Sequence, residues 1–181
     1  MQFENVLPLV LEAEGVYSND PDDAGGETVF GLDQKDDASW SGWADVHRLQ
    51  AAGTPMGQWS KDTALMAAVS AYYKARYWDP AQLDYFPPAL QAACFGCAVN
   101  QGIEKMVRLM QETLNECHAP TTVDGVLGPA TLTAINEAAS PAYLADTFWI
   151  LRAKSYVADV DAKPSQEKFL LGWMHRLING L

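Results

Sequence analysis

One glutamate in this sequence stands where an acid could do chemistry. Glu14 ends an apolar stripe that includes Val10 and Leu11 at helical spacing, so we expect its carboxylate to face the core side of a helix. An unpaired buried carboxylate is costly, and such a group either finds a partner or keeps its proton near neutral pH. Cleavage of a glycosidic bond needs a protonated carboxyl group in a partly apolar cleft, because the leaving oxygen must receive a proton. The alternative is a boundary glutamate that bonds a backbone amide of the next loop.

The loop that follows Glu14 supplies polar groups that could act with it. Asp22 and Asp23 are near enough in sequence to return beside Glu14, where either could stabilise a cationic transition state or position a water molecule. Thr28 could hold that water through its hydroxyl group. Asn and Asp also form self-bonded turns, so a purely structural loop stays open as an alternative. The acids lack the spacing of an EF-hand calcium loop, and we expect no metal here.

Helical patterns dominate the chain and must position these residues. Apolar spacing, together with start and stop signals, predicts helices that begin near residues 5, 60, 88, 103, 129, 141 and 165. The stretch "TVFGLD" predicts a small β-hairpin near residues 28–34. The sequence therefore indicates a mostly α fold, with a weak division near residues 86–88.

The composition excludes several functional classes. The chain has 181 residues, 49% of them hydrophobic, and a net charge of −11. This acidic balance argues against binding of nucleic acid or anionic lipid, and no apolar run approaches the roughly 18 residues of a membrane span. The N-terminal stretch does not resemble a secretory signal. We expect a monomer that uses no cofactor and inserts in no membrane.

The cysteines and histidines do not form a metal-binding pattern. Cys94 and Cys97 in "CFGC" could be half of a redox or metal site, but no second pair completes it. We therefore predict that they are small buried helix residues. The three histidines are scattered, without the spacing of a zinc peptidase.

Three motifs resemble one known family. The stretch "EGVYSNDPDDAGGETVFGLD" is similar to the opening motif of glycoside hydrolase family 108, the N-acetylmuramidases of phage endolysins and secretion-associated muramidases. "YYKARYWDP" resembles a helix end of that family, and "TVDGVLGPATLTAIN" resembles its C-terminal peptidoglycan-binding half. Val16 replaces a glycine of the family motif, and "TVF" replaces a more polar triplet. These departures leave Glu14 in place and bear on substrate range.

The resemblance implies a role for several residues. Glu14 matches the catalytic acid, with Asp23 and Thr28 as the other expected catalytic residues. The expected substrate-binding residues are Tyr17, Asn19, Asp20, Trp78, Asn100 and Asp124. Trp78 is the tryptophan that we expect to stack on a sugar, because it stands at a helix end before a turn. Asp124 has a structural alternative, since it can bond the amides of its own turn.

These observations predict a lysozyme-like helical fold with two halves that share one core. Residues 1–86 would form the catalytic half and residues 87–181 a helical peptidoglycan-binding half. The implied reaction is hydrolysis of peptidoglycan between N-acetylmuramic acid and N-acetylglucosamine, and a lytic transglycosylase is a variant of it. The alternative is a non-catalytic peptidoglycan-binding or virion-structural protein. The protein would be made in the cytoplasm and reach the cell wall through a holin, a secretion system or a virion.

Overall fold

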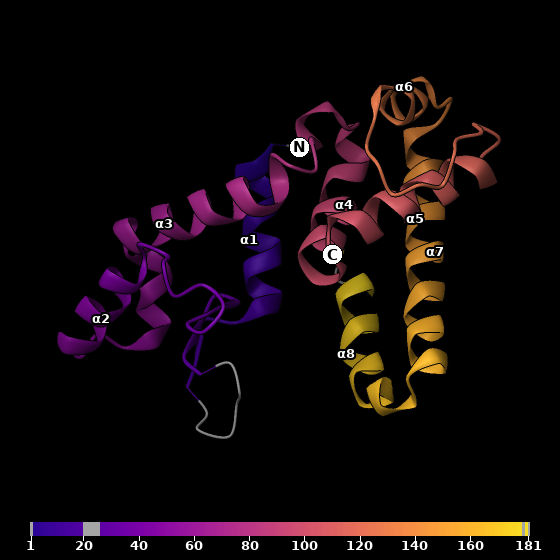
Figure 1. Cartoon of the computed structure of the whole chain (residues 1–181). Helices are drawn as coiled ribbons and strands as arrows, with labels where there is room; N and C mark the ends of the chain where they lie inside the picture. Colours follow the sequence, from indigo (N-terminus) through magenta and orange to yellow (C-terminus); the bar gives the residue numbers. More distant parts are fainter. Residues whose placement is uncertain (1, 20–25, 179, 181) are drawn as a thin grey trace. The chain divides into compact units, whose positions relative to one another are not determined.

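The computed structural model describes residues 2–19, 26–178 and 180 (Figure 1). It is mostly α. The longer helices are α1 (Phe3–Glu14), α2 (Trp43–Ala51), α3 (Thr63–Tyr73), α4 (Pro88–Gln101), α5 (Ile103–Glu116), α6 (Pro129–Glu137), α7 (Pro141–Ala162) and α8 (Glu167–Ile178). Short 3-10 and π-helical segments lie between them: η1 (Met56–Lys61), η2 (Lys74–Trp78), η3 (Leu83–Tyr85) and η4 (Pro164–Gln166). The predicted mostly α, lysozyme-like fold is confirmed.

A small antiparallel sheet follows α1 along the chain. Its strands are β1 (Tyr17–Ser18), β2 (Thr28–Val29) and β3 (Leu32–Asp33), in the order β1-β2-β3. The strands β2 and β3 form the predicted hairpin, and the sequence pattern missed β1. Phe30 and Gly31 make the two-residue turn, with φ of 46° and 79°. Positive φ at both positions is typical of a type I′ turn, which favours Asn-Gly and strains a bulky residue such as Phe.

Local signals explain several helix ends. Gly15, with φ of 78°, ends α1 and donates its N–H to the Leu11 carbonyl at 3.2 Å. Ser140 caps α7 by accepting the Tyr143 N–H at 3.2 Å, and Pro141 follows at the first helical position. Helix α3 begins at Thr63, slightly later than the predicted start near residue 60, and Asp62 caps it by accepting the Leu65 N–H at 2.9 Å.

The chain divides into two compact units. One is Leu7–Arg76, and the other combines Met1–Val6 with Tyr77–Leu181. Here they are called the N-terminal unit and the C-terminal unit. Helix α1 therefore begins in the C-terminal unit and ends in the N-terminal unit. The predicted boundary at residue 86 and the predicted shared core stay predictions.

The core of the C-terminal unit is built on α4, α5 and α7, which pack against one another. Helix α4 is buried continuously from Leu90 to Ala98, with Cys94 and Cys97 inside. Both cysteines are buried free thiols, so the prediction that they are small buried helix residues is confirmed.

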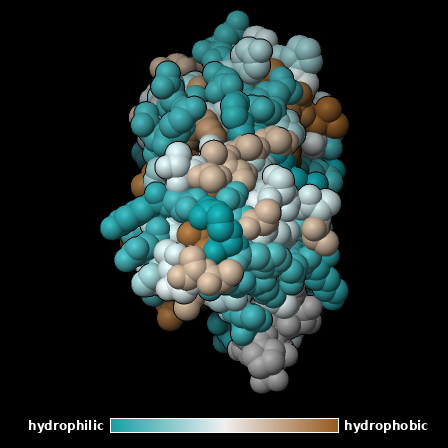
Figure 2. Space-filling view, turned by 90° about the vertical axis from the view of Figure 1, so that its left-hand side faces the viewer, coloured by the Kyte–Doolittle hydropathy of each residue, from teal (hydrophilic) through white to brown (hydrophobic). Residues whose placement is uncertain are grey.

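Hydrophilic residues prevail on the face shown in Figure 2, where hydrophobic residues form small, separate groups. This surface agrees with the net charge of −11. In the described part of the chain, no helix has the length and apolar character needed to cross a membrane.

Candidate active site

Glu14 is the last residue of α1. Its side chain is half-buried, while its neighbours Glu12 and Ala13 are exposed. The apolar face formed by Val10 and Leu11 is buried in the same helix. Because Gly15 stops the helix directly after Glu14, the carboxylate is held at the point where the chain turns into the sheet.

The hairpin turn lies against this carboxylate. A Cβ atom on Gly31 would be 3.1 Å from both Cγ and Oε2 of Glu14, and 2.8 Å from the hydroxyl oxygen of Tyr73. No side chain fits there without displacing one of these groups. Gly31 therefore allows the main chain of the turn to approach the Glu14 carboxylate and the Tyr73 hydroxyl together.

Tyr73 ties α3 to the same turn. Its ring is buried, at 2% exposure, and its hydroxyl donates a hydrogen bond of 2.8 Å to the Phe30 carbonyl. Phe30 in turn donates its N–H to the Val16 carbonyl at 3.0 Å, and its side chain is buried. Burial of the Phe30 ring and these two hydrogen bonds offset the strain of its positive φ. The end of α1, the hairpin and the end of α3 thus meet around Glu14.

A second polar cluster joins the sheet to α2. Gln50 donates from Nε2 to the Tyr17 hydroxyl at 3.1 Å and also to Glu27. His47 Nε2 lies 3.7 Å from Glu27 Oε2, and the Glu27 side chain is only 10% exposed. The Tyr17 ring packs edge-on against Trp59 at 5.0 Å. Burial first, and then the hydrogen bond with Glu27, raise the pKa of Tyr17 above its ordinary value.

Glu27 is a candidate residue that the sequence reasoning missed. It directly follows the glycine pair and precedes β2, and an acid at that place in the motif was the available signal. It gives the N-terminal unit a second carboxylate that is largely shielded from solvent. The structure brings Glu27 together with Tyr17, one of the predicted binding residues.

The other predicted residues of the N-terminal unit are placed unequally. Thr28 is half-buried in β2 and pairs with Ser18 and Asp33, so these three side chains share one face of the sheet. Asn19 is exposed and hydrogen bonds the Tyr17 hydroxyl. The predicted residues Asp20 and Asp23 lie outside the described residues.

Trp78 has a different position from the one that sugar stacking requires. It has 0% exposure, and its indole N–H donates to Asp84 Oδ1 at 2.8 Å. Phe3 and Phe95 each meet its ring edge-on at 5.3 Å. A ring without exposed surface cannot stack on a sugar. Trp78 is therefore a core residue of the C-terminal unit. Phe3 and Phe95, which are distant from it in sequence, cover its ring.

The "VDGVLGPAT" stretch is a turn held by a buried side chain. Asp124 is exposed and accepts the Val126 N–H at 2.8 Å and Gln111 Nε2 at 2.7 Å. These hydrogen bonds, that of Val126 first, lower the pKa of Asp124. Gln111 also accepts the N–H groups of Asp124 and Gly125 at 3.0 and 2.9 Å. The contacts match the structural alternative for Asp124.

Asn100 lies in the C-terminal unit, at the end of α4. Its Oδ1 accepts the Tyr156 hydroxyl at 2.7 Å, and it lines a pocket formed with α7 and α8. Within the described ranges, no group of three or more His, Cys, Asp or Glu side chains could hold a metal ion.

Comparison with known proteins gives two family matches and a structure of similar fold. Residues 7–102, more than half of the chain, match the family described as glycosyl hydrolase 108. Residues 105–178 match a predicted peptidoglycan domain. The structure of Brucella abortus SagA is similar in fold, with a TM-score of 0.63 and 22% identity, over 98% of this chain and 90% of that chain. No curated protein is significantly similar.

The family match contains all of the N-terminal unit, including Glu14, the hairpin and Tyr73. The second match begins in α5 and ends with α8. The chain therefore belongs to the glycosyl hydrolase 108 family and is a glycosidase that acts on peptidoglycan at the cell wall.

Proposed function

We propose that Glu14 is the general acid of a muramidase that cleaves the glycan between N-acetylmuramic acid and N-acetylglucosamine. The observation that carries this proposal is the position of Glu14. Its half-buried carboxylate lies at the end of α1, against a turn where only glycine fits. Such a site limits the positions that the carboxylate can adopt.

In the proposed reaction, Glu14 gives its proton to the glycosidic oxygen as the bond to the anomeric carbon breaks. Water adds its hydroxyl to that carbon and releases a proton, so one reducing end and one free hydroxyl form. A second carboxylate stabilises the cationic transition state or activates the water. Asp23 keeps this proposed role, and Thr28 is proposed to hold the water.

The test compares two isosteric substitutions on the same helix. Glu14→Gln removes the proton donor, and Glu12→Gln removes an exposed acid two residues away. We expect Glu14→Gln to lower the rate of glycan release from purified peptidoglycan by about 10²–10⁴-fold, which is the contribution typical of a general acid. Glu12→Gln should leave this rate within twofold of the wild type.

Both variants should keep the melting temperature of the wild type. A Glu14→Gln enzyme with wild-type turnover would remove Glu14 from the mechanism. The wild-type products test the bond: reducing-end N-acetylmuramic acid supports the muramidase assignment. Reducing-end N-acetylglucosamine contradicts it, and an anhydro sugar identifies a lytic transglycosylase.

A further inference from the structure

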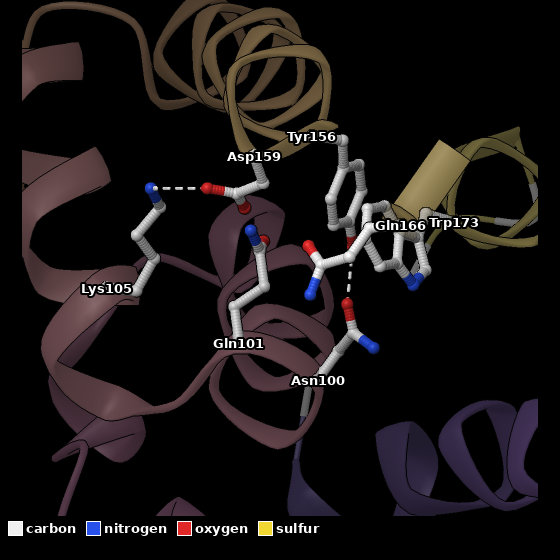
Figure 3. Close-up of a pocket in the computed structure, with 7 residues that line it drawn as sticks. All are labelled: Asn100, Gln101, Lys105, Tyr156, Asp159, Gln166 and Trp173. Atoms are coloured by element: carbon white, nitrogen blue, oxygen red, sulfur yellow. Dashed lines mark hydrogen bonds and ion pairs between the residues drawn. The ribbon is translucent and has the colours of Figure 1, made fainter. Parts of the chain in front are cut away.

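A pocket of about 350 Å³ opens in the C-terminal unit, and all of its lining residues belong to that unit. Figure 3 shows the side chains that surround it. They come from α4, α5, α7, η4 and α8 and are Asn100, Gln101, Lys105, Tyr156, Asp159, Gln166 and Trp173. The volume lies in the range of roughly 300–1,000 Å³ that is usual for small-molecule sites.

Amide groups dominate the polar lining of this pocket. Asn100 uses Oδ1 to accept the Tyr156 hydroxyl, and in the described structure its amide nitrogen has no acceptor. The side chain of Gln166, half-buried, makes no hydrogen bond to any described residue. Free amides that both donate and accept are suited to peptide groups, whose N–H and C=O need both kinds of partner.

The aromatic residues of the pocket are stacked on one another. Trp173 stacks with both Tyr156 and Phe169, with ring centroids 5.2 and 6.1 Å away and interplanar angles of 26° and 28°. The indole therefore already has two aromatic partners. Sugar rings bind to open aromatic faces, so this stack favours a ligand other than a stacked sugar.

Two opposite charges stand at the other side of the pocket. Lys105 Nζ lies 3.7 Å from Asp159 Oδ1, and the two side chains are 37% and 41% exposed (Figure 3). A pair this exposed is weak, so each group can also bind a charged ligand group of opposite sign.

A buried cation lies behind the lining. Arg152 has 0% exposure and donates to Gln101 Oε1 at 3.2 Å and to the Tyr156 hydroxyl at 2.9 Å. Among the described residues, no carboxylate forms an ion pair with it. Lys105, Arg152 and Asp159 together carry +1, in a chain whose total is −11. The local charge therefore favours a carboxylate.

We propose that this pocket binds the peptide stem of peptidoglycan, with Lys105 on a carboxylate, Asp159 on an amine, and Asn100 and Gln166 on peptide groups. A stem peptide is rich in amides and carries both kinds of charge, as the lining requires. The inference rests on the proposed function only in taking peptidoglycan as substrate. Binding at this pocket does not involve Glu14.

The test measures binding by calorimetry with the full-length Glu14→Gln protein. The probes are the free tetrapeptide that an amidase releases from peptidoglycan, with an amine on its diamino acid, and the bare glycan left by that digestion. We expect the tetrapeptide to bind. Lys105→Met should weaken it about tenfold, as the loss of a hydrogen bond to a charged group does. Gln166→Ala should weaken it severalfold.

Glu104→Gln is the matched control, because it breaks an ion pair with Arg108 on the same helix but outside the pocket. It should change the affinity by less than twofold. Gln166→Ala guards against misfolding of Lys105→Met, since the Gln166 side chain has no partner to lose among the described residues.

Absence of tetrapeptide binding at millimolar concentration would overturn the proposal, as would wild-type affinity in both folded pocket variants. Binding of the bare glycan in place of the peptide would show that the pocket is a sugar site. Failure of Glu14 as the acid would leave all of these binding results unchanged, so the two proposals fail separately.

Discussion

At the scale of single residues, Gly31 is the position where conformation and chemistry depend on each other. Its φ of 79° suits glycine, and its missing Cβ leaves room for the Glu14 carboxylate and the Tyr73 hydroxyl. Gly26 has the same φ of 79° but nothing within 4 Å of its Cβ position. Alanine variants at the two glycines therefore distinguish the effect of backbone strain from the effect of displacing the Glu14 carboxylate.

We predict that Gly31→Ala lowers turnover at least tenfold, whereas Gly26→Ala keeps most of the activity. Both variants should lose stability through backbone strain, by about 1–2 kcal/mol. Gly31→Ala has the extra effect of pushing against Glu14 and Tyr73. Rates on purified peptidoglycan and urea denaturation measure the two effects. Equal rates for the two variants would show that the contact with Glu14 does not matter.

At the scale of elements, one glutamine holds a turn that α5 and α6 share. Gln111 is buried, and its Nε2 donates to Asp124, to the Val126 carbonyl at 3.1 Å and to Thr131 Oγ1 at 3.3 Å. The apolar spacing of α5 places Gln111 on the inner face without showing why a polar side chain stands there. A polar side chain is needed there because Gln111 accepts the backbone N–H groups of the turn at Asp124 and Gly125.

Gln111→Met keeps the volume of the side chain and removes its hydrogen bonds. We expect a loss of about 2–4 kcal/mol in the free energy of unfolding, because two part-buried N–H groups lose their acceptor at about 1–3 kcal/mol each. Glu112→Gln, an exposed neighbour on the same helix, should cost less than about 0.5 kcal/mol. Urea denaturation gives both values, and hydrogen exchange should quicken at Asp124 and Gly125. A Gln111→Met protein of wild-type stability would contradict this account of the turn.

The buried thiols of α4 make the free energy of unfolding fall as pH rises in the alkaline range. Burial raises the pKa of the Cys97 thiol to about 11, although Arg152 and Lys105 act in the opposite direction. Because the folded state holds this proton more tightly than the unfolded chain does, the contribution is complete below the ordinary thiol pKa of about 8.5 and is lost as pH rises through 11. The difference of about 2.5 pKa units corresponds to at most about 3–4 kcal/mol.

We therefore predict that Cys97→Ala flattens the fall of unfolding free energy between about pH 8.5 and 11. Cys117→Ala, at a half-buried position outside α4, serves as control and should keep the wild-type slope. Denaturant unfolding at several pH values measures the slopes. The cavity left by alanine lowers the free energy of unfolding equally at every pH, so it does not change the slope. Parallel curves for wild type and Cys97→Ala would refute the prediction.

At the scale of the whole molecule, the first residues of the chain belong to the C-terminal unit. Phe3 lies 5.3 Å from Trp78 and 5.8 Å from Phe95, measured between ring centroids. Phe3 and Trp78 precede the predicted boundary at residue 86, and Phe95 follows it. This aromatic cluster supports the proposal that the halves before and after residue 86 share a core.

A fragment of residues 1–86 tests that proposal, because it keeps Phe3 and Trp78 but lacks Phe95. We expect it to be insoluble or to lose its cooperative melt, since two large aromatic side chains lose a buried partner. Full-length protein with Phe3→Ala should still fold, with a loss of about 3–5 kcal/mol. A fragment that melts cooperatively and cleaves peptidoglycan would show that the halves are separable.

The sequence by itself determined what depends on neighbours along the chain. Helical spacing predicted the mostly α fold and put Glu14 at the end of an apolar stripe, and the "TVFGLD" stretch predicted the hairpin. These features follow from the periods of helix and strand, and from turn residues, which are readable over a few positions.

Tertiary structure alone decided which distant groups meet. The Tyr73 hydroxyl reaches the Phe30 carbonyl 43 residues away, Gln111 reaches the turn at Asp124, and Phe3 and Phe95 bury Trp78. No local period encodes these contacts, because they arise from the packing of elements that are far apart in sequence. The same packing buries Trp78, which the sequence predicted to stack on a sugar, and places Gly31 beside the Glu14 carboxylate.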